Sequence, residues 1–222
     1  MKKKEFKTIK YAEVFPSGFD AGKKYPTIIY LHGAGTRGED FSCIENNPYF
    51  GCVSKHKDFP FITYAPQCYA DSWFDIFETL EEFVKYVIGL DYTDSSRIYL
   101  TGASMGGYGT WQLAMTMPEC FAALVPICGG GMYWNAERLK NIPVWAFHGA
   151  WDNVVSPEES FKMVNSVNSH GGNAKLTIYP ATMHDSWTAT YSNYEVFEWL
   201  LKHTKSCTKV DSNGMDDPGL FG

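Results

Sequence analysis

The segment RIYLTGASMGGY, residues 97–108, decides the fold that this 222-residue chain adopts. It begins with an apolar strand pattern and ends in a helical one, and the pentapeptide between them has the form G-x-S-x-G with Ser104 at its centre. In that context the pentapeptide predicts a sharp strand-to-helix turn that presents the Ser104 hydroxyl outward from a strained backbone. Gly102 and Gly106 are needed because a Cβ at either position would collide with the neighbouring strand or helix. An ordinary serine in a glycine-rich turn is the alternative.

Apolar runs and helical patterns alternate along the rest of the chain. The other predicted strands are residues 27–31, 61–65, 123–127, 144–148 and 175–179, with 7–15 as a candidate edge strand. Several are apolar on both faces, as expected of parallel strands covered by helices on each side. Predicted helices cover residues 79–88, 156–170 and 194–202. The alternation predicts an α/β fold, a doubly wound and mostly parallel sheet with helices on both faces.

The domain organisation follows from uniform composition. The chain has no internal repeat, no low-complexity linker and no composition break. We therefore predict a single domain over residues 1–205 and a polar C-terminal tail over residues 206–222.

Composition and charge narrow the classes of partner. Hydrophobic residues make up 45% of the chain, as in ordinary globular proteins, and the net charge of −6 argues against a nucleic-acid partner. The run Lys2–Lys4 is interpreted as a solvated tail. No stretch approaches the roughly 20 apolar residues that cross a bilayer, so we predict no membrane insertion. No leader pattern precedes the domain, which favours a cytoplasmic location; secretion with a removed leader is the open alternative.

The six cysteines form no CxxC pair and no cysteine–histidine spacing typical of zinc sites. We predict no metal site. An even number permits disulfides, and Cys43 and Cys52 are close enough in sequence to pair, but mostly free thiols in a reducing cytoplasm are favoured. Cys120 and Cys128 lie in apolar segments and are expected in the core.

A serine hydroxyl needs a base to remove its proton, and in turns of this type an acid and a histidine follow later in the chain. Asp152 lies on the loop after predicted strand 144–148, facing the crevice where open α/β sheets bind ligands. Capping of its own loop is its alternative role. His184 lies on the loop after the last predicted strand, where a base belongs. Asp185 is adjacent to His184 and is poorly placed to turn back on that ring.

The other five histidines are less suited to act as the base. His32 and His148 each end a predicted strand just before a glycine, and we expect structural hydrogen bonds from both. The remaining three lie in polar surroundings or at a helix stop: His56, His170 and His203.

Acyl transfer also requires hydrogen-bond donors for a developing oxyanion. The Met105 amide begins the helix after Ser104 and is one candidate. The glycine-rich loop 31–38 follows the first central strand, and the Ala34 amide is the second candidate. A phosphate-binding loop is disfavoured because no Lys-Ser/Thr pair follows these glycines.

Three aromatic residues are candidates for a substrate pocket. Trp73 and Trp187 fall in loops at the predicted site, and Tyr108 begins the helix after Ser104. They are expected to form an apolar wall around an acyl or alcohol group, with buried packing as the alternative.

Four segments resemble the α/β-hydrolases, in the phospholipase/carboxylesterase-like and feruloyl-esterase-like branch. They are YPTIIYLHGAGTRGED, RIYLTGASMGGYGTWQLAMTMPECFAALVPICGGG, PVWAFHGAWDNVVSP and MHDSWTATYSN, within residues 25–202. The resemblance implies an α/β-hydrolase fold, a triad of Ser104, Asp152 and His184, an oxyanion hole around Ala34 and Met105, ester substrates and no cofactor. Two departures from the pattern are expected. The region before Tyr25 is too short for the usual pair of antiparallel strands, so the N-terminal strands are reduced, and there is no lid domain.

The predicted function is hydrolysis of short-chain or aryl carboxylic esters, including sugar-linked feruloyl or acetyl esters, through an acyl-enzyme. The predicted partner is a small-molecule ester, and the sequence does not indicate an oligomeric state. A serine peptidase or thioesterase using the same three residues is the alternative. A catalytically inactive α/β-hydrolase that serves as a binding module is a third.

Overall fold

The computed structural model describes residues 1–205, and the predicted tail 206–222 lies outside the described residues. One eight-stranded sheet has the order β1-β2-β4-β3-β5-β6-β7-β8. The strands are β1 (Lys2–Phe6), β2 (Ile9–Val14), β3 (Tyr25–Leu31), β4 (Ile62–Pro66), β5 (Thr93–Ala103), β6 (Ala123–Ile127), β7 (Val144–Gly149) and β8 (Ala174–Tyr179). β3 to β8 are parallel, so the predicted parallel sheet is confirmed.

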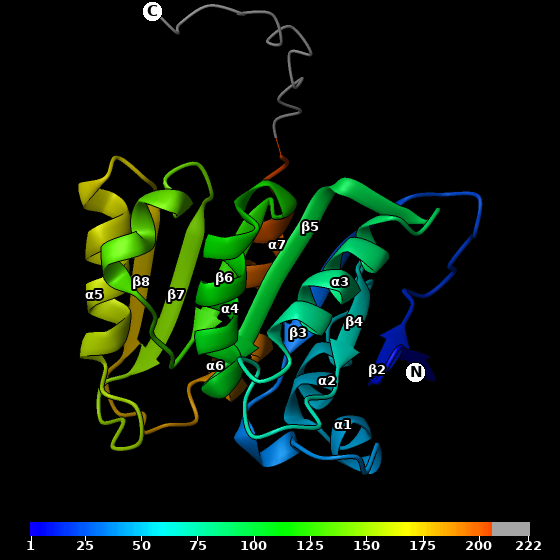
Figure 1. The fold of residues 1–222 in the computed structure, drawn as a ribbon, viewed down its shortest axis with the longest axis horizontal. Coiled ribbons are helices and arrows are strands. Elements are labelled where there is room, and N and C mark those ends of the chain that lie inside the picture. The colour runs from blue at the N-terminus through cyan, green and yellow to red at the C-terminus, as the bar shows by residue number, and fades with distance from the viewer. Residues whose placement is uncertain (206–222) are drawn as a thin grey trace, which may run out of the picture.

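Helices cover both faces of this sheet (Figure 1). They are α1 (Ser42–Glu45), α2 (Pro48–Val53), α3 (Phe77–Ile88), α4 (Met105–Thr116), α5 (Glu158–Ser169), α6 (Trp187–Ser192) and α7 (Tyr194–Leu201), with 3-10 turns η1 (Ala34–Thr36), η2 (Pro118–Cys120) and η3 (Tyr133–Leu139). The apolar side chains of α3, α4 and α5 pack in one core cluster, and those of α2, α6 and α7 in a second. Each face of the sheet therefore has its own core.

The N-terminal strands are not reduced, which corrects the sequence-based expectation. β1 and β2 form an antiparallel hairpin, and β2 pairs antiparallel with β4. The hairpin fits into residues 2–14 because Phe6 pairs with Ile9 across a turn of only two residues, in which Lys7 adopts a φ of 51°. The region before Tyr25 is therefore long enough for both strands.

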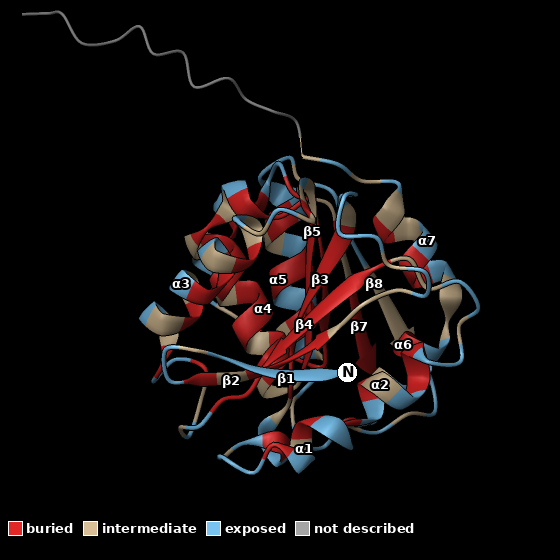
Figure 2. Ribbon diagram, turned by 90° about the vertical axis from the view of Figure 1, so that its right-hand side faces the viewer, coloured by how far each residue is buried: buried red, intermediate tan, exposed pale blue. Residues whose placement is uncertain are grey.

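The lysine run Lys2–Lys4 is likewise not a free tail. It forms most of β1, the exposed strand at one edge of the sheet (Figure 2). The Lys4 ammonium lies 2.8 Å from the carboxylate of Glu13, which is buried. Exposed lysines on an edge strand discourage pairing with another chain.

The turn after β5 has the predicted geometry. Ser104 adopts φ 56° and ψ −118°, a conformation that L-residues rarely adopt, and its amide donates to the Ile127 carbonyl at 2.9 Å. A Cβ on Gly106 would collide with the carbonyl oxygen of Leu31, and one on Gly102 with the carbonyl oxygen of Gly106. The start of α4 therefore packs backbone to backbone on the end of β3.

The cysteines that the structure describes are free thiols, and Cys43 and Cys52 are not paired. Cys120 and Cys128 are buried, as predicted. Cys207 lies outside the described residues. None of the helices within residues 1–205 is long and apolar enough to cross a membrane.

Substitution Gly106→Ala should destabilise the fold. The added methyl group meets the Leu31 backbone, which cannot move without disturbing the pairing of β3 with β5. We expect the free energy of unfolding, measured by urea denaturation, to fall by about 3 kcal/mol.

Gly51→Ala is the matched control, since Gly51 is also helical and a Cβ there meets nothing within 4 Å. Equal stability of the two variants would refute this account of the turn.

Candidate active site

The structure brings the side chains of Ser104, Asp152 and His184 together at the carboxyl edge of the sheet. Ser104 lies between β5 and α4, Asp152 follows β7, and His184 follows β8. His184 Nε2 lies 2.8 Å from Ser104 Oγ, and His184 Nδ1 lies 2.7 Å from Asp152 Oδ2. The three are far apart in sequence and form one chain of hydrogen bonds.

The direction of these hydrogen bonds follows from their acceptors. A carboxylate only accepts, so His184 donates from Nδ1 and its Nε2 is free to accept the proton of the Ser104 hydroxyl. Burial by itself would raise the pKa of Asp152, but hydrogen bonds from His184 and from the amides of Val155 and Val154 outweigh it and lower that pKa. Asp152 is therefore a carboxylate at neutral pH, facing an imidazole.

Close backbone contact brings His184 to this position. The Trp151 amide donates to the carbonyl of Thr182 at 3.0 Å. A Cβ on Gly149 would collide with the carbonyls of Thr182 and Met183, so the loop that carries His184 lies directly on the end of β7. Asp185, the neighbouring acid, instead accepts from the amide and hydroxyl of Thr188 at the start of α6.

The two candidate oxyanion donors belong to segments next to Ser104, since Ala34 lines the same cavity as Ser104 and Met105 follows Ser104 in the chain. Met105 is the first residue of α4 and Ala34 the first of η1, so neither amide has a partner within its own helix. Among residues 1–205 neither amide donates to another backbone carbonyl. Gly33 brings the η1 loop close, since a Cβ there would lie 3.6 Å from Ser104 Cβ.

Asn47 is a buried residue at this site that the sequence analysis missed. Its Nδ2 donates to Thr36 Oγ1 at 3.0 Å, and its Oδ1 accepts from the Tyr30 hydroxyl and the Tyr49 amide. It therefore ties the η1 loop to the start of α2. The Asn-Pro pair at residues 47–48, an N-cap followed by proline at the first helical position, is the sequence signal that marks it.

His32 is structural, as predicted. Its Nε2 accepts from the Cys68 amide at 2.9 Å, and its Nδ1 donates to the Gly33 carbonyl at 2.7 Å. Burial lowers the pKa of His32 to about 4, so the ring is neutral at physiological pH. It supports the strand end from which the η1 loop leaves.

Trp73 does not line a substrate pocket, which corrects the sequence-based expectation. Its side chain is 0% exposed, and its Nε1 donates to the His32 carbonyl at 3.0 Å. A Cβ on Gly109 of α4 would lie 3.2 Å from the indole ring. The indole therefore packs beneath the site, between the loop after β4 and α4.

Two cavities contain the other two aromatic candidates, and one of these cavities is lined by Ser104. One, of about 490 Å³, is bounded by Ser104 and His184 and has Trp187 in its wall; its other lining residues are Tyr30, Gly33, Ala34, Gly35, Thr36, Asn47, Pro48, Ala103 and Val154. The other, of about 570 Å³ and mostly apolar, has Tyr108 in its wall, together with Phe74, Phe77, Gln112, Gly131 and Met132. Trp187 and Tyr108 thus lie in different cavities, and of the two it is the cavity of Trp187 that Ser104 and His184 also line.

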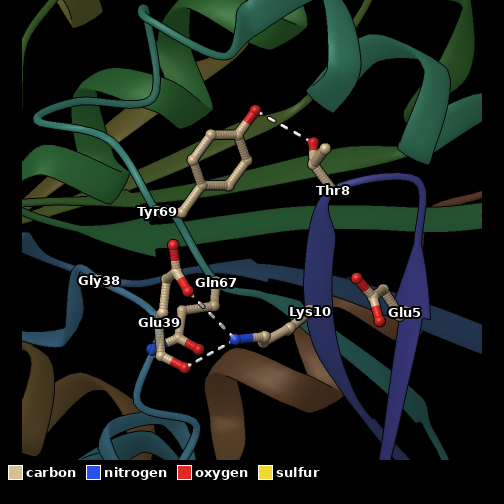
Figure 3. Close-up of a pocket in the computed structure, with 7 residues that line it drawn as sticks. All are labelled: Glu5, Thr8, Lys10, Gly38, Glu39, Gln67 and Tyr69. Atoms are coloured by element: carbon tan, nitrogen blue, oxygen red, sulfur yellow. Dashed lines mark hydrogen bonds and ion pairs between the residues drawn. The ribbon is translucent and has the colours of Figure 1, made fainter.

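A third cavity, of about 300 Å³, lies between the β1–β2 hairpin and the loops after β3 and β4 (Figure 3). Two hydrogen bonds join residues of its lining. Lys10 donates to the carbonyl of Glu39 at 3.0 Å, and Thr8 donates to the hydroxyl of Tyr69 at 3.1 Å. It contains none of the three converging residues.

Within residues 1–205, one group of side chains has the composition of a metal site. Atoms of Cys128, Asp152 and His184 lie within 4.8 Å of one another. Asp152 and His184 are already hydrogen-bonded to each other, so binding of a cation would break that hydrogen bond. We assign no metal role to this group.

Comparison with known proteins identifies the family. The profile of the prolyl oligopeptidase family matches residues 75–136 and 132–210, which include Ser104, Asp152 and His184. The chain belongs to this family. It is therefore a serine hydrolase.

Solved structures of similar fold include esterases. A thermostable esterase is 35% identical, with a TM-score of 0.76, over 88% of this chain and 59% of that chain. Est1E from Butyrivibrio proteoclasticus is 17% identical, with a TM-score of 0.69, over 90% of this chain and 97% of that chain. The predicted α/β-hydrolase fold is confirmed.

The curated relatives are longer proteins. Dipeptidyl-peptidase 5 from Schizosaccharomyces pombe is 25% identical over 87% of this chain but only 35% of its own length. The bifunctional acetylxylan esterase/xylanase XynS20E from Neocallimastix patriciarum is 24% identical over 60% of this chain and 20% of its own length. This chain thus spans about a third or less of these relatives.

Acid should destabilise the fold in part through His32. Below about pH 6.5 the unfolded chain binds a proton at His32 that the folded chain, with its pKa of about 4, does not bind. This stabilisation is therefore present above pH 6.5 and lost as the pH falls toward 4, to a total of about 3 kcal/mol.

Urea unfolding of the wild type and of His32→Gln across this pH range measures the effect. The glutamine oxygen can still accept from the Cys68 amide but does not titrate, so the stability of the variant should depend less on pH. Parallel pH dependences would contradict the assignment.

Proposed function

We propose that this serine hydrolase cleaves carboxylic esters, with Ser104 as nucleophile, His184 as general base and acid, and Asp152 as the residue that orients His184. The observation that carries the proposal is the hydrogen-bonded chain from Ser104 Oγ through His184 to Asp152 Oδ2. The thermostable esterase supports an ester substrate, since it is the relative of known structure with 35% identity. The acetylxylan esterase relative supports the same reaction.

The reaction proceeds in two acyl transfers. His184 Nε2 removes the hydroxyl proton as Ser104 Oγ attacks the ester carbonyl, and His184 then protonates the departing alcohol. A water molecule deprotonated by His184 attacks the acyl-enzyme, and Ser104 leaves with the proton. Asp152 stabilises the imidazolium form of His184 in both steps without itself becoming protonated.

The amides of Ala34 and Met105 are proposed as the oxyanion hole. Ala34 lines the cavity next to Ser104, and the Met105 amide lies at the positive end of the α4 dipole. Such preorganised donors supply several kcal/mol of transition-state stabilisation because they point at charge that develops only during reaction.

Short-chain and aryl esters are the proposed substrates, including sugar-linked ones. The cavity beside Ser104 and His184 has an indole in its wall and no aspartate, glutamate, lysine or arginine. Est1E has been solved with ferulic acid bound, which supports including feruloyl esters among the candidates.

Peptide hydrolysis is the second candidate function. The prolyl oligopeptidase profile and the dipeptidyl-peptidase 5 relative favour it. The same serine, histidine and aspartate perform either reaction, so the leaving group has to be tested directly. A dipeptidyl p-nitroanilide assayed beside p-nitrophenyl esters separates the two, and we expect higher kcat/KM for the esters.

Substitution Ser104→Ala should abolish ester hydrolysis while the fold remains intact. We expect kcat to fall by a factor on the order of 10⁶, and the loss of Asp152 to be less severe. The assay is a panel of p-nitrophenyl esters of rising chain length, together with feruloyl and acetylated-sugar esters.

His170→Ala is the control, because His170 is exposed at the end of α5 and should not affect the rate. Retention of more than a few per cent of the activity by Ser104→Ala would remove Ser104 from the mechanism.

Substitution Trp187→Ala should change acyl preference. Removing the indole widens the cavity next to Ser104, so the ratio of kcat/KM for aryl or longer acyl groups to that for acetyl should change. Trp134→Ala is the control, since Trp134 is 69% exposed on η3 and lines neither cavity. An unchanged ratio in Trp187→Ala would exclude the indole from substrate binding.

A further inference from the structure

His148, at the end of β7, is a fully buried histidine whose two ring nitrogens are both engaged. Its Nε2 lies 3.0 Å from the Val155 carbonyl and 3.2 Å from Asp152 Oδ2. Both of these groups only accept hydrogen bonds, so Nε2 must carry a proton. His148 therefore donates to the Val155 carbonyl, and its N–H lies beside the carboxylate that orients His184.

His148 and the loop after β7 together hold Asp152. Oδ2 accepts from His184 and lies 3.2 Å from His148 Nε2, and Oδ1 receives the amides of Val154 and Val155 at 2.9 and 3.0 Å. Three donors thus hold the buried carboxylate, and His148 donates to the carbonyl of Val155, which supplies one of them. Its plane is held in place, since rotation would break hydrogen bonds at both oxygens.

Ser160 of α5 controls the other nitrogen of His148. Its Oγ lies 2.8 Å from His148 Nδ1 and 3.0 Å from the Gly129 carbonyl, but a hydroxyl has only one proton to donate. Ser160 therefore links the His148 ring to the Gly129 carbonyl after β6.

We propose that His148 is a positioning residue of the hydrolytic site, which holds Asp152 Oδ2 against His184 and takes up part of the negative charge of the carboxylate. The inference rests on the proposed roles of Ser104, His184 and Asp152. His148 does not touch the reacting atoms; it acts only through the carboxylate.

Two consequences follow from removing the His148 donor. Oδ2 is free to move from its position against His184, which slows proton removal from Ser104. The carboxylate also becomes more negative and stabilises the protonated imidazole of His184, which cannot act as a base. The acid limb of the pH–rate profile therefore moves to higher pH.

The other titratable groups near Asp152 do not produce such a shift. Burial raises the pKa of Cys128 on the β6 side to about 12, and burial raises that of Tyr108 on α4, so both stay neutral through the acid limb. Glu159 of α5 is paired with Lys162 at 2.8 Å, and Asp185 accepts from Thr188. The acid limb therefore depends on His184, His148 and Asp152.

The test compares His148→Asn with His148→Gln. The glutamine amide nitrogen reaches the position of Nε2 and can donate to the Val155 carbonyl beside Asp152, whereas the shorter asparagine amide reaches only toward Ser160. The readout is the second-order rate constant for labelling of Ser104 by a fluorophosphonate, from about pH 5 to about pH 9. This reagent needs no knowledge of the natural ester.

We expect His148→Asn to slow labelling about 10- to 100-fold and to move the midpoint of the acid limb up by roughly half a pH unit. His148→Gln should restore the rate to within about threefold of the wild type and restore the midpoint. His170→Asn, the same substitution at the exposed end of α5, should match the wild type. Equal losses in His148→Asn and His148→Gln, with an unmoved acid limb, would overturn the proposal in favour of a merely structural role.

Wild-type protein provides a second measurement that does not depend on the stability of the variants. Nitrogen-15 NMR of the histidine rings should find a proton on His148 Nε2, and an unprotonated Nε2 would overturn the proposal. Labelling of wild-type Ser104 without cleavage of any ester in the panel would instead contradict the proposed function and leave this inference standing.

Discussion

The start of α4 approaches the ends of β3, β5 and β6 so closely that backbone meets backbone. Gly102, Gly106 and Gly107 have no room for a Cβ, because carbonyl groups of Leu31, Gly106 and Ile127 occupy that space. This contact forces Ser104 into its left-handed conformation, with its amide held by the Ile127 carbonyl. The position of the hydroxyl is therefore set by the main chain and does not depend on the packing of exposed side chains.

The other two members of the site reach Ser104 because of strand order. β5, β6, β7 and β8 are consecutive neighbours, so the loops after β7 and β8 leave the sheet at the same edge as the turn after β5. Gly149 allows the loop that carries His184 to lie on the end of β7, next to Asp152. The geometry at Ser104 thus depends on close contacts at two strand ends.

His32 and His148 are both buried and both precede a glycine, yet they have different roles because their surroundings differ. His32 accepts an amide at Nε2 and supports the loop on which Ala34 lies, while His148 donates from Nε2 to the Val155 carbonyl beside Asp152. The residue type and the local sequence are the same, yet the hydrogen-bonding partners differ. Buried polar groups of this kind are costly unless fully paired, and both rings have partners at each nitrogen.

The amino-acid sequence by itself determined the alternation of strands and helices, the turn at Ser104, and the order serine, aspartate, histidine along the chain. These features are local, because they depend on hydrophobic periodicity and on glycines that a tight turn requires. The strand predicted over residues 7–15 is β2, but it lies between β1 and β4 and not at the edge. The edge strand β1 was missed because its polar lysines carry no apolar pattern. Trp73 was placed in the pocket because a loop position does not reveal on which side of the loop an indole is buried.

Only the tertiary structure decided which side chains hydrogen-bond to one another and which line the same cavity. Asn47 and His148 act through hydrogen bonds to residues on other elements, and neither contact follows from sequence spacing. The division of Trp187 and Tyr108 between two cavities likewise depends on how the η1 loop and α4 meet at Ser104. Residues close in space but distant in sequence are joined by the packing of the whole sheet, which no local pattern encodes.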